Sequence, residues 1–291
     1  MSTDNQAADL RPRRSVLYMP AANERALEKA QTIPADALIF DLEDAVAPDS
    51  KDAARANAIA AASSGSYGSR EITIRCNALD TPWGLADVGA AARSGAAAVV
   101  IPKVNSVAAL DAVAEALDQA GAPTTMSIWA MVETPTAIFD VRAIASHQRV
   151  NVLVMGTNDL AKELRSTGRG PLTPHLAVAI LAAREAGIAI LDGVFNDVKD
   201  ADAFAKECVD GQRMGFDGKT LIHPSQVGPC NEAWAPSDDE ITYAGRVIAA
   251  FDEALADGRG VVTVDGRMIE NLHVDNARRT LAVVAAIAAL A

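Results

Sequence analysis

Short apolar runs recur along the chain and predict eight β-strands. Each run is dominated by aliphatic and aromatic residues and is bounded by polar or turn-forming residues, which is typical of strands buried on both faces in a parallel sheet. The runs occupy residues 15–20, 37–44, 71–77, 97–103, 126–134, 151–159, 189–195 and 218–224.

Amphipathic, alanine-rich segments lie between these runs and predict helices. Residues 173–187, TPHLAVAILAAREAG, begin with threonine and end with glycine, which favour the start and the stop of a helix. The regular alternation of strand and helix predicts an α/β fold of the (β/α)8 TIM barrel type. Residues 280–291, TLAVVAAIAALA, predict a further packing helix.

Composition favours one large domain and argues against several classes of partner. The chain has 291 residues, of which 50% are hydrophobic, and this is enough for the core of an α/β barrel. Its net charge is −12 and it has no basic run, so neither nucleic acid nor an anionic membrane is an expected partner.

The N-terminal segment and the cysteines suggest a cytoplasmic protein. Residues 1–13 have no apolar stretch, so they predict a flexible tail rather than a secretory signal or an anchor. No later run reaches the roughly 20 apolar residues of a membrane span. Cys76, Cys208 and Cys230 are far apart and lack the spacing of metal ligands, which indicates small core residues in a reducing compartment.

Polar residues end seven of the eight predicted strands. The active site of a TIM barrel lies where its strands end, so we expect these side chains at a common mouth. Any one of them could instead be a solvated rim residue or half of a salt bridge. They are Glu43 and Asp44, Arg75 and Asn77, Lys103, Glu133, Asn158 and Asp159, Asp192, and His223.

Glu133 and Asp159 end consecutive strands, which lie only about 5 Å apart in a sheet. Carboxylates brought this close repel each other unless a proton or a cation lies between them. The absence of His and Cys at both ends favours Mg²⁺ over Zn²⁺, with Mn²⁺ as a possible substitute. Alternatively, one carboxylate could pair with Lys103 or Arg75.

Two further strand ends offer groups that could bind an anionic substrate. Arg75 carries a planar guanidinium that suits carboxylate or enolate oxygens, and it could also neutralise Glu43 or Asp44. The motif MGTNDL places the backbone of Gly156, Thr157 and Asn158 beside Asp159, where N–H groups could hold a substrate carboxylate.

A set of motifs runs along the chain from about residue 13 to residue 281. The motifs are RSVLYMPAANERALEKA, DALIFDLEDAV, IRCN, IPKV, VETP, MGTNDLA, DGVFNDVKD and GFDGKTLIHPSQV. In order and spacing this set resembles the citrate lyase beta-subunit-like family, which groups with malyl-CoA and citramalyl-CoA lyases in the HpcH/HpaI aldolase superfamily. The resemblance implies a trimeric or hexameric TIM barrel that uses Mg²⁺ to make and break C–C bonds in acyl thioesters.

The same resemblance implies roles for individual residues. Glu133 and Asp159 match the metal ligands, and Glu133 also borders the substrate. Arg75 matches the arginine at the reacting oxygens, and Glu43 with Asp44 matches the acid pair that orders the water around the metal. The positions that match the CoA-binding residues of relatives are Arg14, Lys29, Ile222, His223 and Pro224.

In these relatives a C-terminal segment covers the barrel of a neighbouring subunit and supplies an acid/base aspartate within a Met-Ile-Asp motif. This chain has Glu270 at that position, one methylene longer. The resemblance therefore implies a barrel over residues 14–235 and a C-terminal helix and lid over 236–291. Glu270 could serve a substrate of different size, support thioester hydrolysis, or only favour a helix start through its charge.

Three functions remain open. The leading hypothesis is an Mg²⁺-dependent lyase that cleaves a 3-hydroxyacyl-CoA, such as malyl-CoA, methylmalyl-CoA or citramalyl-CoA, into an acyl-CoA and a 2-oxo acid. The alternatives are a malyl-CoA thioesterase on the same scaffold and a citrate-lyase-type subunit that acts on a citryl thioester. His223 invites a role as general base, but a structural or CoA-contacting role is favoured.

Overall fold

The computed structural model describes residues 11–290 and divides the chain into two compact units. The larger unit is Arg13–Trp234, and the smaller begins at Ala235. Most of the expected N-terminal tail, residues 1–10, lies outside the described residues.

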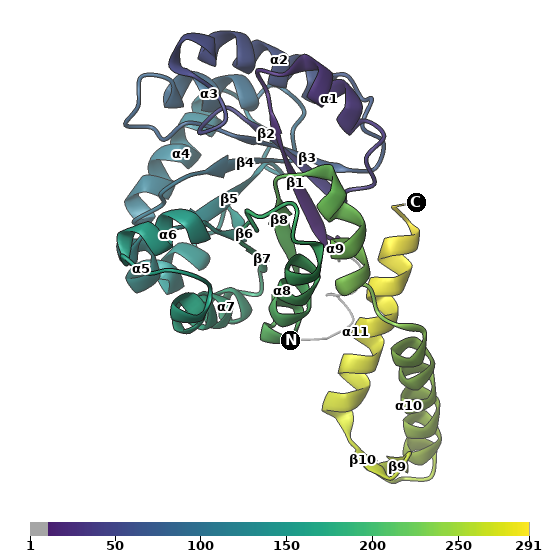
Figure 1. Cartoon of the computed structure of the whole chain (residues 1–291). Helices are drawn as coiled ribbons and strands as arrows, with labels where there is room; N and C mark the ends of the chain where they lie inside the picture. Colours follow the sequence, from purple (N-terminus) through teal and green to yellow (C-terminus); the bar gives the residue numbers. More distant parts are fainter. Residues whose placement is uncertain (1–10, 291) are drawn as a thin grey trace. The chain divides into compact units, whose positions relative to one another are not determined.

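The larger unit is a closed barrel of eight parallel strands, which confirms the predicted TIM barrel (Figure 1). Each strand pairs with the next one along the chain, and β1 pairs with β8 to close the ring. The strands are β1 (Ser15–Pro20), β2 (Ala37–Asp41), β3 (Glu71–Arg75), β4 (Ala98–Ile101), β5 (Ser127–Val132), β6 (Val150–Met155), β7 (Ala189–Asp192) and β8 (Gly218–Leu221).

Helices connect the strands and surround the barrel (Figure 1). Their ends follow ordinary capping chemistry: α7 ends at Gly187, whose φ of 71° is a left-handed conformation that glycine adopts without strain. The helices are α1 (Glu24–Ala30), α2 (Lys51–Ser63), α3 (Gly84–Ala91), α4 (Val107–Gln119), α5 (Pro135–Ala145), α6 (Thr157–Glu163), α7 (Thr173–Ala186), α8 (Ala201–Met214) and α9 (Val227–Ala233). Short 3₁₀ turns are η2 (Pro48–Ser50), η3 (Gly170–Leu172) and η4 (Pro224–Gln226).

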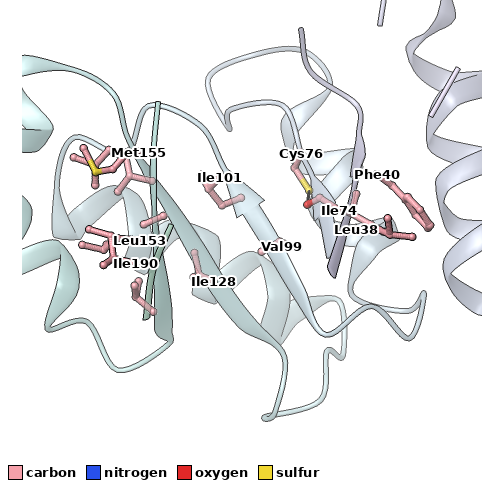
Figure 2. Close-up of a cluster of buried hydrophobic side chains, with 14 of the residues drawn as sticks. Leu38, Phe40, Ile74, Cys76, Val99, Ile101, Ile128, Leu153, Met155 and Ile190 are labelled. Atoms are coloured by element: carbon pink, nitrogen blue, oxygen red, sulfur yellow. Dashed lines mark hydrogen bonds between the residues drawn. The ribbon is translucent and has the colours of Figure 1, made fainter. Parts of the chain in front are cut away.

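Alternate strand residues build two separate apolar layers. In β2, Ala37 and Ile39 belong to a cluster that fills the barrel, whereas Leu38 and Phe40 belong to the larger cluster between barrel and helices. Figure 2 shows part of this outer layer, in which Leu38 and Phe40 are labelled with residues of five other strands. Because side chains alternate along a strand, Asp41 at the end of β2 faces inward.

Arginines close the amino end of the barrel. Arg13 binds Glu71 at the start of β3, and Arg14 binds Asp36 just before β2, each through two guanidinium nitrogens. Gly218 permits this arrangement, because a Cβ there would lie 1.8 Å from the carbonyl oxygen of Arg13. The charged groups at this end are therefore paired with each other.

The smaller unit is a helical hairpin with its own core. It consists of α10 (Asp238–Ala256), the antiparallel strands β9 (Val262–Val264) and β10 (Arg267–Ile269), and α11 (Asn271–Ala288), so a C-terminal helix is present as predicted. Phe251 and Val274 belong to an apolar cluster made only of residues from this unit. Throughout residues 11–290, no helix is both long enough and apolar enough to cross a bilayer.

Candidate functional site

Asp41 and Arg75 form a buried ion pair with two hydrogen bonds at the carboxyl end of the barrel. They are opposite each other in the register of β2 and β3. Arg75 donates from Nε and Nη2 to the two oxygens of Asp41, at 2.7 and 2.6 Å. Asp41 was not among the predicted site residues, because β2 is apolar on both faces and its sequence does not show which way the last residue points.

Arg75 is shared among further acids. Its Nη1 lies 2.7 Å from Glu43 and 3.6 Å from Asp44, so Arg75, predicted to neutralise one acid or the other, contacts both. The guanidinium also lies over the ring of Tyr18, 4.8 Å from its centroid. Asp44 is largely exposed, which makes Glu43 the stronger of the two partners.

Glu43 has a perturbed proton affinity. Burial raises its pKa to about 7, against the attraction of Arg75, while the negative charge of Asp44 raises it further. A carboxyl group with a pKa near neutrality can accept or release a proton under physiological conditions. Glu43 is therefore the described side chain at this mouth best suited to proton transfer.

Glu133 follows β5 and points inward beside Lys103 and Gly156. Its Oε1 accepts a hydrogen bond from the backbone N–H of Lys103 at 2.7 Å. A Cβ on Gly156 would lie 2.2 Å from Oε2 of Glu133, so only glycine leaves room for this carboxylate. Burial raises the pKa of Glu133, the Lys103 N–H opposes that rise, and the charge of Asp159 adds to it.

Asp159 lies in the first turn of α6 on the same side of the mouth. Its Oδ2 lies 3.4 Å from Nζ of Lys103, which also lies 3.9 Å from Oε1 of Glu43. Lys103 thus connects the two acids that were predicted to hold a metal, and it also reaches Glu43. Lys103 was predicted only as a possible partner of Glu133 or Asp159, not as a link among all three acids.

The pair Glu133 and Asp159 fits a magnesium ion. Burial raises the pKa of Glu133, because the positive groups nearby do not fully stabilise its ionised carboxylate. A divalent cation would supply the missing positive charge. Within residues 11–290, no three His, Cys, Asp or Glu side chains gather to hold a metal alone. Mg²⁺ needs no larger cluster, since one or two protein carboxylates suffice and water and substrate oxygens complete the octahedron.

The start of α6 is held by the loop after β7. Gly193 packs against Thr157, since a Cβ there would lie 2.2 Å from the Thr157 Oγ1. Asn158 and Asn196 exchange amide hydrogen bonds at 2.8 and 3.2 Å. These contacts fix the segment that carries Gly156, Thr157, Asn158 and Asp159.

The residues expected at CoA are not all brought to the mouth. Arg14 precedes β1 and binds Asp36 at the amino end of the barrel, so it is far along the strands from Arg75 and Glu133. Lys29 is exposed in the last turn of α1. We retain Lys29 as a candidate contact for CoA and omit Arg14, whose guanidinium is already occupied.

The segment Ile222, His223 and Pro224 follows β8 and is held by Gln226. The Gln226 Oε1 accepts the N–H groups of Ile222 and His223 at 3.0 and 3.2 Å, and its Nε2 donates to Phe195 at 3.0 Å. His223 Nδ1 lies 2.7 Å from the Ser225 hydroxyl and caps η4. The structure gives this histidine a local structural task.

Two predicted strand-end groups point elsewhere. Asp192 faces the helix layer, where it binds Lys219 at 2.9 Å and Arg169 at 2.9 Å, so its expected place at the mouth is wrong. Asn77 is also buried outside the mouth, between Lys51 and Asp87. Ile190, two residues before Asp192 in β7, belongs to the outer apolar layer, so Asp192 also faces outward. Asn77 lies beyond the end of β3 at Arg75, where strand alternation no longer sets its direction.

Glu270 belongs to the C-terminal unit. It is the residue before α11, it is exposed, and its N–H donates to Nδ1 of His273 at 3.2 Å. This is the position at which an acidic charge favours a helix start. The structure therefore agrees with the helix-start role of Glu270 and leaves its acid/base role as a proposal.

Comparison with known proteins gives consistent matches over the barrel, and individual relatives match nearly the full length. The profile of the HpcH/HpaI aldolase/citrate lyase family matches residues 14–224. A (3S)-malyl-CoA thioesterase from Cereibacter sphaeroides (strain ATCC 17025) is 50% identical over 281 residues, which cover 96% of each chain. The citrate lyase subunit beta of Escherichia coli (strain K12) is 36% identical over 291 residues, which cover 97% of this chain and 96% of that protein.

A solved structure shares the fold across nearly the same length. The protein CitE from Mycobacterium tuberculosis, in complex with magnesium, acetoacetate and coenzyme A, has a TM-score of 0.78 and 26% identity. The similarity covers 95% of this chain and 100% of that one. With these matches and the barrel site described above, the chain belongs to the HpcH/HpaI aldolase/citrate lyase family.

Proposed function

We propose that this protein is a Mg²⁺-dependent enzyme that hydrolyses the thioester of a 3-hydroxyacyl-CoA of the (3S)-malyl-CoA type. The observation that carries the choice of hydrolysis is the 50% identity to a (3S)-malyl-CoA thioesterase over 96% of the chain. The magnesium and coenzyme A in the CitE structure support the cofactor and the CoA moiety.

The residues at the mouth suit the charges of this reaction. Water adds to the thioester carbonyl carbon, the C–S bond breaks, and the products are the free hydroxy acid and CoA. The carbonyl oxygen gains negative charge as water adds, and we assign Nη1 of Arg75, which contacts Glu43 at 2.7 Å in the free protein, as the cationic donor to it. Bound Mg²⁺ would supply a Lewis acid for the oxygens of the hydroxy acid, held by Glu133 and Asp159.

Proton transfer from water requires a base that is strong and still partly ionised near neutral pH. Glu43 meets both conditions, because a pKa of about 7 makes it a stronger base than an ordinary carboxylate while about half of it stays ionised at pH 7. We assign it the proton taken from water. That proton goes on to the leaving thiolate as CoA departs. Glu270 of the C-terminal unit is the second proposed acid/base group, which would relay the proton when the lid of a neighbouring subunit covers the barrel.

C–C cleavage is the second candidate, and the citrate lyase beta relative at 36% identity supports it. The two reactions place negative charge on the same thioester oxygen, as a tetrahedral oxyanion in hydrolysis and as an enolate in cleavage. Arg75 serves both, so the chemistry is decided by whether water or the hydroxyl group of the substrate loses a proton.

Product analysis separates the two candidates. We expect purified protein with Mg²⁺ and (3S)-malyl-CoA to release malate and free CoA, measured by mass spectrometry and a thiol reagent. Acetyl-CoA with glyoxylate would instead establish the lyase. Excess chelator and Glu133→Gln should each remove most activity, and full turnover in chelator would contradict the metal requirement.

A further inference from the structure

Lys103 has an unusual backbone conformation at the proposed site. Its φ is 50°, and among residues 11–290 only two other non-glycine residues, Arg165 and Asp265, have positive φ. An L-residue in this region is strained, and such strain persists where the surroundings fix it. Here it lets the backbone N–H of Lys103 bind Glu133 while the side chain extends into the mouth.

The ammonium group of Lys103 lies among the carboxylates that would otherwise need a cation. Its Nζ is 3.4 Å from Asp159 and 3.9 Å from Glu43, and the side chain is 48% exposed. Such a partly exposed pair at these distances is weak, because solvent screens it. The backbone of Lys103 is therefore fixed by its hydrogen bond to Glu133, whereas its ammonium group is only weakly bound.

A divalent cation on Glu133 and Asp159 would come close to this ammonium. Like charges repel, so Lys103 cannot keep its contact with Asp159 at low cost once the metal is bound. Its exposed, flexible stem allows the charge to move while the N–H remains on Glu133. The hydroxyacyl substrate of the proposed function carries a free carboxylate, which is a suitable new partner.

We propose that Lys103 is a resident cation that a divalent metal displaces from Asp159 and that then binds the free carboxylate of the substrate. The second half of this proposal rests on the proposed function, whereas the first half depends only on the metal. In the free protein Lys103 competes with the metal; with the acid present it attracts the acid. Lys103 thus makes metal and acid bind cooperatively.

Direct binding measurements test both halves without any turnover. Mn²⁺ is the metal probe, followed by electron paramagnetic resonance, and (S)-malate is the acid probe, followed by calorimetry at saturating Mn²⁺. We expect Lys103→Met to tighten Mn²⁺ binding about threefold to tenfold without malate, and to weaken malate binding about tenfold. Lys103→Arg keeps the charge and should remain close to wild type.

The control is Lys162→Met, which removes an exposed lysine from the other end of α6 and has the same effect on net charge. It should change both affinities less than twofold. Mn²⁺ binding that is unchanged or weaker in Lys103→Met overturns displacement. Unchanged malate binding in Lys103→Met overturns the proposed role of Lys103 in binding the substrate carboxylate. Wild-type protein that binds Mn²⁺ but no malate refutes both that role and the proposed substrate. In that case the Mn²⁺ affinities alone decide whether the metal displaces Lys103.

Discussion

The carboxylate of Asp41 accepts two hydrogen bonds from Arg75, at 2.7 and 2.6 Å, and the pair is buried at the ends of neighbouring strands. Asp41 thereby fixes Nε and Nη2 of the guanidinium and directs Nη1 toward Glu43 and Asp44. Nη1 is the atom that a substrate oxygen would share with these acids. The pair therefore provides orientation in addition to charge.

Arg75→Lys tests this orientation. Lysine keeps the positive charge but cannot bind Asp41 through two nitrogens and still offer a third donor. We expect turnover to fall about 100-fold or more while the Michaelis constant changes only a few-fold, because the lost interaction strengthens in the transition state. Steady-state kinetics measure both constants.

Arg142→Lys is the matched control, since Arg142 forms an exposed pair with Glu185 outside the barrel mouth. It should leave both constants unchanged. If Arg75→Lys raises only the Michaelis constant, Arg75 binds the ground state and does not stabilise developing charge.

Strand positions were predictable from the sequence, but the direction of strand-end side chains was not. Asp41 and Asp192 are each the last residue of a strand, yet Asp41 faces the barrel interior and Asp192 faces the helices. Both faces of a parallel barrel strand are apolar, so the runs that contain them show no alternation from which to read the face. Only the register within the closed ring decides it.

The same limit applies to the links between strands. The backbone N–H of Lys103 on Glu133, and the reciprocal amides of Asn158 and Asn196, join residues about 30 or more positions apart. Residue types at strand ends can suggest a metal site or an anion site. They do not specify which atom meets which, because that depends on loop conformations such as the positive φ of Lys103.

Glu43 should make the metal-free protein less stable as pH rises. Its pKa in the folded state is about 7, above the ordinary value of 4.5, so the folded state binds the proton more tightly than the unfolded state. Its contribution to stability is present below pH 4.5 and is lost as pH rises through 7. We expect the free energy of unfolding of Glu43→Gln, relative to that of wild type, to rise by on the order of 2 kcal/mol from pH 5 to pH 8.

Urea unfolding in chelator at the two pH values measures this difference. Glu163→Gln, which removes an exposed carboxylate from α6, provides the background effect of such a substitution. The difference in free energy of unfolding between wild type and Glu43→Gln could instead be the same at both pH values. That result would show that folding does not raise the pKa of Glu43.

Gly156→Ala should damage the metal site through sterics alone. The added Cβ would lie 2.2 Å from Oε2 and 2.3 Å from Cβ of Glu133, so the Glu133 side chain must move. We expect Mn²⁺ affinity to fall at least tenfold and the protein to lose about 1–3 kcal/mol of stability. Metal titration and thermal unfolding measure the two effects.

Gly89→Ala is the control for this substitution. Gly89 lies within α3 and a Cβ there meets no atom within 4 Å, so alanine should stabilise the helix by about 0.5–1 kcal/mol and leave Mn²⁺ binding unchanged. Normal Mn²⁺ affinity in Gly156→Ala would show that Glu133 is not a metal ligand.

Glu270 provides the test of the C-terminal unit. The family resemblance implies that this unit supplies an acid/base group to another subunit, whereas the structure shows Glu270 before α11 beside His273. If the group acts in proton transfer, Glu270→Ala should abolish turnover and leave Mn²⁺ and CoA binding nearly intact, because the proposed contacts for both belong to the barrel. Glu270→Asp restores the residue of the relatives, and a gain of C–C cleavage in that variant would tie the glutamate to the choice of reaction.

Mixed oligomers decide whether Glu270 acts across subunits. A Glu270→Ala subunit has an intact barrel, and an Asp159→Asn subunit has an intact Glu270, so neither is active alone. Random mixing in equal amounts pairs an intact barrel with an intact neighbouring lid at about one quarter of the sites, and activity should recover to about that fraction. Subunit exchange is verified by native mass spectrometry. If exchange is complete and no activity returns, Glu270 serves its own barrel. Wild-type turnover in Glu270→Ala alone would instead show that Glu270 takes no part in the reaction.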